Sequence, residues 1–183
     1  MRYAGIGSRQ TPQYILNIMG ITAELLAKRG YECATGAADG ADQAFAEGAL
    51  RAGGVVHLHL PWQGYNKGWV SSLWGKVALH VLPSYDSEAM MSVYRYHPNP
   101  ERLSQGAKKL HARNYRIVEG SAFVICWTKD GITTGGTGQA IRIAEDFGIK
   151  VYNLGNREIL TAFEARIERL TGVNPRPRHI QPW

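Results

Sequence analysis

Apolar positions along the chain follow two repeating patterns, one typical of buried strands and one typical of amphipathic helices. The run at residues 122–127 is continuously apolar, as expected for a strand that is covered on both faces of a parallel sheet. Residues 13–29 instead place Ile15, Ile18 and Met19 at helical spacing on one face. These patterns predict strands at residues 2–7, 31–35, 55–60, 77–82, 122–127 and 149–154, and helices at residues 13–29, 39–52, 84–95, 103–118, 138–147 and 156–171.

Strands and helices alternate along most of this sequence. Such alternation predicts an α/β fold, here a three-layer Rossmann-like sandwich with a mainly parallel central sheet. We expect residues 1–171 to form a single domain, in which residues 61–100 are an irregular, aromatic-rich insert or flap. Residues 172–183 contain three prolines and are expected to form an extended tail. In such sheets ligands bind beyond the carboxyl ends of the strands.

Three glycine-rich turns each stand between a predicted strand and a predicted helix. Glycine lets the backbone approach a ligand closely, and a helix start offers free N–H groups with partial positive charge. The three turns together therefore predict a phosphate or nucleotide site at one edge of the sheet. Their candidate ligand residues are Gly5, Gly7, Ser8 and Arg9 in the first turn, Thr35, Gly36, Gly40 and Asp42 in the second, and Thr134, Gly135, Gly136, Thr137, Gly138 and Gln139 in the third.

Some side chains in these turns have a distinct expected role. The Ser8 hydroxyl would hold a phosphate, with Arg9 as the counter-charge. Thr137 is expected both to cap a helix and to donate a hydrogen bond, and Thr11 is expected to cap the first helix. Asp42 would either accept a hydrogen bond from a ribose hydroxyl or act as a base, unless it only stabilises the start of its helix.

A group of aromatic and polar residues follows the strand at residues 55–60, at the same edge of the sheet. An aromatic ring at Trp62 or Tyr65 could stack on a base, and Asn66 could hydrogen-bond it. The alternative is that these residues pack a mobile flap. His57 and His59 lie within the strand with no cysteine or carboxylate nearby in the sequence, so we expect no metal site and no other cofactor.

The composition is that of an ordinary globular domain with a basic surface. The 183 residues carry a net charge of +6, which favours an anionic ligand without separating a nucleotide from a polymer. Basic residues gather at residues 108–116 and again near the C-terminus. Cys33 and Cys126 both fall in predicted buried strands and are expected to be unpaired. With no apparent signal peptide and no apolar run long enough to span a membrane, we expect a cytoplasmic protein without membrane association.

The glycine turns resemble those of the SLOG superfamily, which includes DNA-processing protein A and the Lonely Guy phosphoribohydrolases. The runs 5–9 and 35–42 are similar to the two signatures of the DNA-processing protein A side, and 135–139 is similar to the Gly-Gly-x-Gly-Thr turn of the Lonely Guy side. The resemblance covers residues 1 to about 155. The chain also resembles the compact single-domain members of this superfamily that are found in bacteriophages. The resemblance implies a homodimer or another homo-oligomer, and it implies that Arg113 and Asn114 point toward the ligand.

One position departs from the Lonely Guy pattern. That family carries a glutamate, acting on the N-glycosidic bond, three residues after the final threonine of the turn. The motif places Gln139 at the threonine and Arg142 at the glutamate, and arginine would bind phosphate rather than act as a carboxylate. Glu145 lies one helical turn further along the same face, so Asp42 and Glu145 are the candidate catalytic acids.

Three hypotheses for function follow. The leading one is the binding of a nucleotide or nucleotide-derived small molecule, for sensing or sequestration, with an ADP-ribose derivative as one form of that ligand. The second is an N-glycosidic nucleotide phosphoribohydrolase. The third is binding of single-stranded DNA like that of DNA-processing protein A, which the basic helix at residues 103–118 and the basic tail favour.

Overall fold

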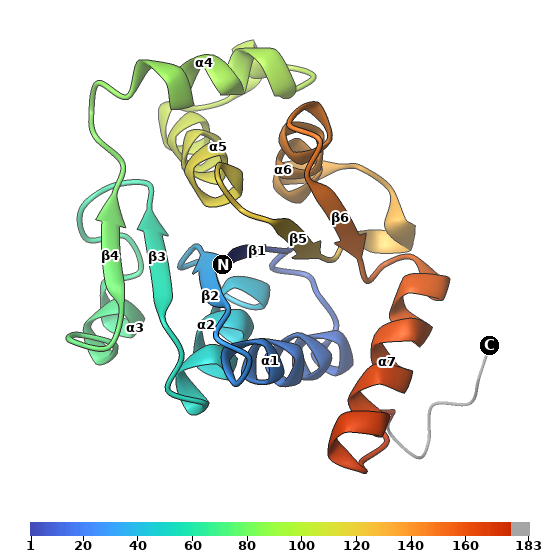
Figure 1. Cartoon of the computed structure of the whole chain (residues 1–183). Helices are drawn as coiled ribbons and strands as arrows, with labels where there is room; N and C mark the ends of the chain where they lie inside the picture. The colour runs from blue at the N-terminus through green and yellow to red at the C-terminus, as the bar shows by residue number, and fades with distance from the viewer. Residues whose placement is uncertain (177–183) are drawn as a thin grey trace.

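A six-stranded, all-parallel sheet forms the centre of the computed structural model, which describes residues 1–176 (Figure 1). The strand order across the sheet is β4-β3-β2-β1-β5-β6. All six predicted strands are present, and the α/β Rossmann-like fold is confirmed. The strands are β1 (Arg2–Gly5), β2 (Glu32–Thr35), β3 (Val56–Leu60), β4 (Ala78–Val81), β5 (Phe123–Cys126) and β6 (Lys150–Asn153).

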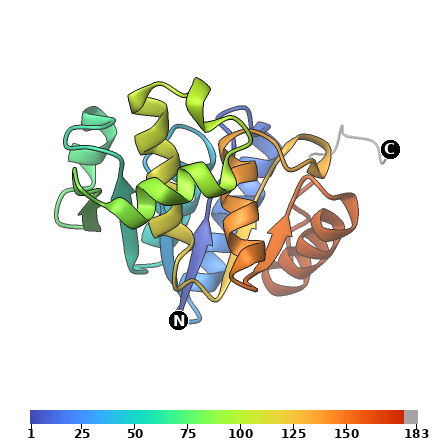
Figure 2. The ribbon, with the colours of Figure 1, turned by 90° about the horizontal axis from the view of Figure 1, so that it is seen from above.

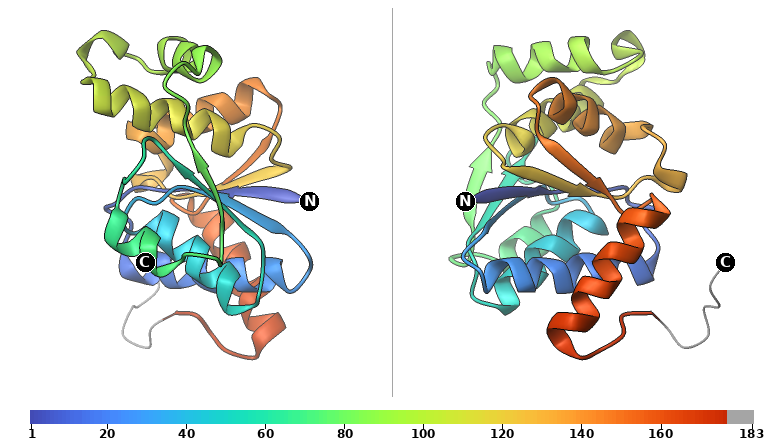
Figure 3. Two further views of the ribbon diagram at one scale, coloured as in Figure 1. Left: turned by 90° about the vertical axis from the view of Figure 1, so that its left-hand side faces the viewer. Right: turned by 45° about the vertical axis from the view of Figure 1, so that its right-hand side comes forward.

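Helices cover both faces of this sheet and make the two outer layers of the sandwich. Figure 3 shows α4, α5 and α6 on one face, and α1, α2, α3 and α7 on the other. Seen from above in Figure 2, α4 lies across α5 and α6. The helices are α1 (Gln13–Ala27), α2 (Ala41–Arg51), α3 (Lys67–Ser72), α4 (Ser87–Tyr96), α5 (Gln105–Val118), α6 (Gly135–Asp146) and α7 (Arg157–Thr171).

The course of the chain through the sheet creates a crevice beside β1. From β1 the chain runs outward through β2 and β3 to the edge strand β4, and it then returns to β5 on the other side of β1. The segment after β1 leads to α1 on one face, whereas the segment after β5 leads to α6 on the opposite face (Figure 3). Diverging connections of this kind mark the position where open α/β sheets bind ligands.

Alternating side chains of the strands fill the core on the two faces. Tyr3 and Cys33 pack toward α1 and α2, and Ala4 and Ala34 pack toward α5 and α6. Both cysteines are buried and unpaired, as predicted, and burial raises the pKa of each thiol to about 12. Small side chains on the central strands, such as Ala4 and Ala34, let α5 and α6 lie close to the sheet.

Some local features differ from the sequence-based expectations. Within residues 61–100, β4 and α4 correspond to the predicted strand and helix, and β4 pairs with β3 in the sheet, whereas α3 lies in a part that was expected to be irregular. Pro12, not Thr11, is the N-cap residue of α1, because the Thr11 hydroxyl instead donates to the Ser8 carbonyl at 2.6 Å. Residues 177–183 of the predicted tail lie outside the described residues. Within residues 1–176, none of the helices has the length and apolar character needed to cross a membrane.

Candidate functional site

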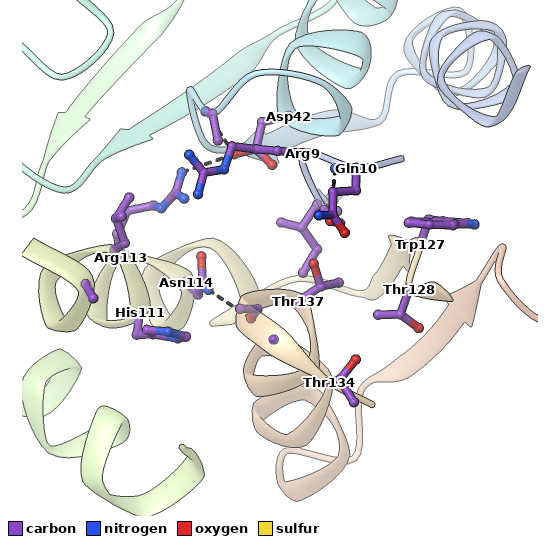
Figure 4. A pocket seen from close by; sticks show the side chains of 18 of the residues that line it. Arg9, Gln10, Asp42, His111, Arg113, Asn114, Trp127, Thr128, Thr134 and Thr137 are labelled. Carbon is purple, nitrogen blue, oxygen red and sulfur yellow. Dashed lines mark hydrogen bonds and ion pairs between the residues drawn. The ribbon is translucent and has the colours of Figure 1, made fainter. Parts of the chain in front are cut away.

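A cleft of about 510 Å³ opens at the carboxyl ends of β1 and β5 (Figure 4). The glycine turns that sequence reasoning singled out all contribute to it, the second through Ala38 and Asp42 only. Its walls also include part of α5 and the segment after β5. The lining segments are residues 6–10, Ala38, Asp42, Tyr65, several residues of 107–114, residues 127–129 and residues 134–137.

The start of α6 forms one wall of the cleft. Gly138 N–H makes the first intrahelical bond, to the Thr134 carbonyl at 2.9 Å. The N–H groups of Gly135, Gly136 and Thr137 precede that bond, so the helix itself cannot satisfy them. Thr134 is the N-cap residue and Thr137 lies inside the helix, so the predicted capping role of Thr137 is wrong. The wall offers free donors and the positive end of a helix dipole to an anion.

The turn after β1 forms the facing wall. Ser8 Oγ accepts a hydrogen bond from Gln10 N–H at 3.0 Å, which orders the turn. Arg9 lies exposed at the cleft and forms no ion pair with any carboxylate of residues 1–176. Gly5 and Gly7 are needed for packing against α2, because added side-chain carbons would lie 2.4 Å from Phe45 Cγ and 2.5 Å from Ala41 Cβ. Gly7 lines the cleft as well, whereas Gly5 does not.

A buried ion pair between Asp42 and Arg113 closes the inner end of the cleft. Arg113 Nη1 lies 3.2 Å from Asp42 Oδ2, and the same carboxylate oxygen accepts from Ala38 N–H. Burial raises the pKa of Asp42, while the guanidinium of Arg113 opposes that rise. A side-chain carbon at Gly36 would lie 1.4 Å from Arg113 Nη1, so glycine at this position leaves room for the ion pair.

Other predicted residues of the second and third turns lie behind the cleft wall. The buried Thr35 hydroxyl donates to the Gly5 carbonyl at 2.6 Å, which ties β2 to β1. Gly40 has a φ of +88° at the start of α2, a conformation that favours glycine. Gly138 lies against the backbone of Thr133, and Gln139 is fully buried beneath the cleft. These residues shape the site without lining it.

Arg142 and Glu145 lie outside the cleft, contrary to the assignment from the sequence motif. Arg142 Nε donates to the Tyr96 carbonyl at 2.6 Å and thus holds the end of α4 against α6. Glu145 is exposed and does not line the cleft. Asp42 is therefore the one carboxylate among the lining residues, and its Oδ2 is already bonded to Arg113.

The three residues predicted after β3 have different positions. Tyr65 lines the cleft, and Trp62 packs edge-on against it with ring centroids 5.1 Å apart. Trp62 itself is not a lining residue. Asn66 Nδ2 donates to the Ala37 carbonyl at 2.9 Å and to Asp39 Oδ1 at 3.1 Å. Its amide nitrogen thus stabilises the second turn, and of the three residues only Tyr65 lines the cleft.

Sequence reasoning missed several residues that the fold brings to the cleft. Trp127 and Lys129 follow β5, and Figure 4 shows Trp127 at the opposite end of the cleft from Arg113. His111 and Asn114 project from α5, and only Asn114 of this pair was predicted. The position of Trp127 and Lys129 directly after a buried strand was the available signal, because such positions meet at the ligand edge of a parallel sheet.

A stack of histidines lies elsewhere, on the α5-facing side of β3 and β4. The rings of His57 and His59 both stack on His80, with centroid separations of 5.4 and 4.7 Å. A carboxylate does reach this group from the neighbouring strand, since His57 Nε2 is 2.8 Å from Glu32 Oε2. Within residues 1–176, however, no group of three or more histidine, cysteine, aspartate or glutamate side chains is arranged to hold a metal ion.

Buried His59 predicts an acid-sensitive fold. Burial, together with His80, Arg2, Arg113 and His57, lowers its pKa to about 3. Because this value lies below the 6.5 of an unfolded histidine, its contribution to stability is complete above about pH 6.5 and is lost as the pH falls. We therefore compare the free energy of unfolding in urea for the unmodified chain and for His59→Leu. Below pH 6 it should fall less steeply in His59→Leu, by about 1.4 kcal/mol per pH unit. The same pH dependence of the unfolding free energy in both proteins would contradict this prediction.

The fold and the cleft define a Rossmann-like α/β protein with a glycine-rich cleft at the carboxyl ends of its strands. Several solved structures share this fold at low sequence identity. DNA processing protein A from Helicobacter pylori, which binds single-stranded DNA, is similar with a TM-score of 0.63 and 19% identity, over 94% of this chain and 80% of that one. The molybdenum cofactor carrier protein of Chlamydomonas reinhardtii is similar with a TM-score of 0.54 and 14% identity, over 93% of this chain and 84% of that one.

A third similar structure is the structural genomics target TM1055, with a TM-score of 0.53 and 19% identity over 82% of this chain and 71% of that one. No protein-family model matches the sequence, and no curated protein matches it significantly. At these identities the likeness concerns the fold, so the function has to be argued from the cleft itself.

Proposed function

We propose that the chain binds a nucleotide or nucleotide-derived small molecule in this cleft. The observation that carries the proposal is the meeting of the unsatisfied N–H groups at the start of α6 with three cationic side chains, those of Arg9, Arg113 and Lys129. Backbone donors at a helix start and guanidinium groups are both suited to phosphate oxygens. The only carboxylate of the lining residues is already paired.

The size and the aromatic residues of the cleft support a ligand larger than phosphate alone. Its volume of about 510 Å³ lies in the range typical of small-molecule sites. Trp127 and Tyr65 line it from separate segments, and either ring offers a face for stacking on a heterocycle. Together these features describe a ligand that joins phosphate to a heterocycle. An ADP-ribose derivative, with two phosphates and one base, fits the same description.

Binding for sensing or sequestration is better supported than turnover. A phosphoribohydrolase needs a carboxylate at the glycosidic bond, but Glu145 lies outside the cleft and Asp42 is bonded to Arg113. The buried, unpaired cysteines suit the reducing cytoplasm that we propose as its location. A homodimer remains part of the proposal on the strength of the SLOG resemblance.

Calorimetric titration with pyrophosphate, AMP and ADP-ribose tests the proposal. We expect binding of at least one of these probes, and we expect Arg9→Ala and Lys129→Ala each to weaken it at least tenfold, because each removes a charge-assisted contact. Lys109→Ala is the matched control, since Lys109 is exposed on α5 and does not line the cleft. Absence of binding for all three probes, with tight binding of an oligonucleotide, would overturn the proposal.

Single-stranded DNA is the second candidate ligand. The similarity in fold to the DNA-binding structure from Helicobacter pylori and the exposed Lys109 of α5 favour it, whereas Arg113 and Arg116 of the same helix are held by carboxylates. Oligothymidylate binding would then weaken steeply with salt, because each phosphate contact releases counterions. It would also weaken in Lys109→Ala, which distinguishes a DNA surface from a small-molecule cleft.

A further inference from the structure

His111 is a cleft residue that the proposed function does not yet use. It projects from α5 toward the start of α6, as Figure 4 shows, and is half-buried. A side-chain carbon built at Gly136 would lie 3.7 Å from His111 Cε1, so the imidazole ring stands next to the backbone of the proposed phosphate wall. In the sequence it is only one member of a basic run.

A chain of hydrogen bonds determines which ring nitrogen of His111 carries the proton. Asn114 Nδ2 lies 3.2 Å from the Gly136 carbonyl, which can only accept, so the amide nitrogen of Asn114 faces this side. The same nitrogen lies 3.3 Å from Gln139, which must therefore present its oxygen, Oε1. His111 Nδ1 is 3.3 Å from that oxygen, so Nδ1 is the protonated nitrogen and donates to it.

The ring is also kept neutral. Burial lowers the pKa of His111, and the nearby side chains of His97, Arg113 and Arg142 lower it further, while the bond to Gln139 opposes them. With Nδ1 protonated and the ring neutral, Nε2 is an acceptor. Nε2 has no hydrogen-bond partner within residues 1–176 and is not fully buried. A ligand in the cleft can therefore reach it.

We infer that His111 Nε2 accepts a hydrogen bond from a ligand hydroxyl, so that the cleft selects ribonucleotides over nucleotides that lack ribose hydroxyls. The inference rests on the proposed function. Phosphate oxygens accept and do not donate, so a neutral acceptor next to the phosphate wall fits a different part of the ligand. A ribose hydroxyl is the donor that nucleotides carry close to phosphate, and it is often read by an acidic residue. Here the only lining carboxylate, Asp42, is held by Arg113.

Nitrogen NMR of the histidine side chains tests the protonation state without any ligand. We expect His111 to show the Nδ1–H tautomer at pH 7 and a pKa below that of a free histidine. Gln139→Leu should remove the preference for this tautomer, because it removes the acceptor that holds the Nδ1 proton. A charged ring or the Nε2–H tautomer at pH 7 in the unmodified protein would overturn the inference.

Ligand discrimination tests the hydroxyl contact itself. Titrations with AMP and with 2′,3′-dideoxy-AMP should differ about tenfold in affinity, the effect of one hydrogen bond. His111→Phe should bring that ratio close to one, and His111→Gln should restore part of it, because the glutamine oxygen can occupy the position of Nε2. A ratio of ten that persists in His111→Phe would refute the contact.

Pyrophosphate separates this inference from the proposed function. Pyrophosphate binding combined with equal affinities for AMP and its dideoxy form, or with no AMP binding, overturns ribose selection and leaves the phosphate site intact. Failure of pyrophosphate, ADP-ribose and both adenosine nucleotides to bind the unmodified protein overturns the proposed function, and the hydroxyl contact with it.

Discussion

Replacing Arg113 by methionine is expected to destabilise the fold by about 3–5 kcal/mol, because it leaves the buried carboxylate of Asp42 without its partner. The two side chains are only 7% and 5% exposed. Desolvation already raises the pKa of Asp42, and the guanidinium is the main group that opposes this rise. Urea unfolding at pH 7 measures the loss, and titration with pyrophosphate should show weaker binding as well.

A double variant, Arg113→Met with Asp42→Asn, is the control for this prediction. It removes both charges, so it should be more stable than the single variant despite carrying one more substitution. The pH dependence has a definite sign. Burial already raises the folded-state pKa of Asp42 above its unfolded value, and loss of Arg113 raises it further, so stability is lost as the pH rises. The deficit of Arg113→Met should therefore shrink as the pH is lowered from 7 toward the ordinary pKa of an aspartate. Equal losses in the single and double variants would contradict the account.

The sheet and most helices were predictable because their signals are local. A continuous apolar run such as residues 122–127 identifies a buried strand, and the spacing of apolar residues identifies the helix at 13–29. The start of α6 was placed too late, at residue 138. Its first turn contains three glycines, which disfavour helix in isolation, and propensity alone therefore indicated a turn.

The location of the cleft was predictable, but the roles of single residues in it were not. Carboxyl ends of parallel strands meet at one edge, which brings the glycine turns together. Gly36, however, makes room for Arg113, and that side chain comes from a helix 71 residues beyond its partner Asp42. Arg142 matched a motif position yet bonds to the end of α4. Such roles depend on which distant helix packs alongside, and local sequence spacing carries no record of that.

Gly155→Ala is expected to have the second large effect, because its side-chain carbon would lie 1.9 Å from the Thr128 carbonyl oxygen. It would also lie 2.7 Å from the backbone nitrogen of Gly131, so backbone rather than a flexible side chain has to move. Asn153 normally holds this loop, accepting from Thr128 N–H at 3.1 Å and donating to its hydroxyl at 2.6 Å. We expect a loss of about 1–3 kcal/mol on urea unfolding, the usual cost of overpacking.

The same substitution should reach the ligand site, because Thr128 and Lys129 line the cleft. Displacing the loop moves the Lys129 ammonium group, so the affinity for pyrophosphate should fall about tenfold, comparable to losing one charged contact. Gly68→Ala is the matched control. Gly68 lies in α3 with no atom within 4 Å of an added carbon, so this change should leave pyrophosphate binding unaltered and raise stability by about 0.5–1 kcal/mol. If Gly155→Ala is as stable and binds pyrophosphate as tightly as Gly68→Ala, the loop after β5 does not form the cleft wall in solution.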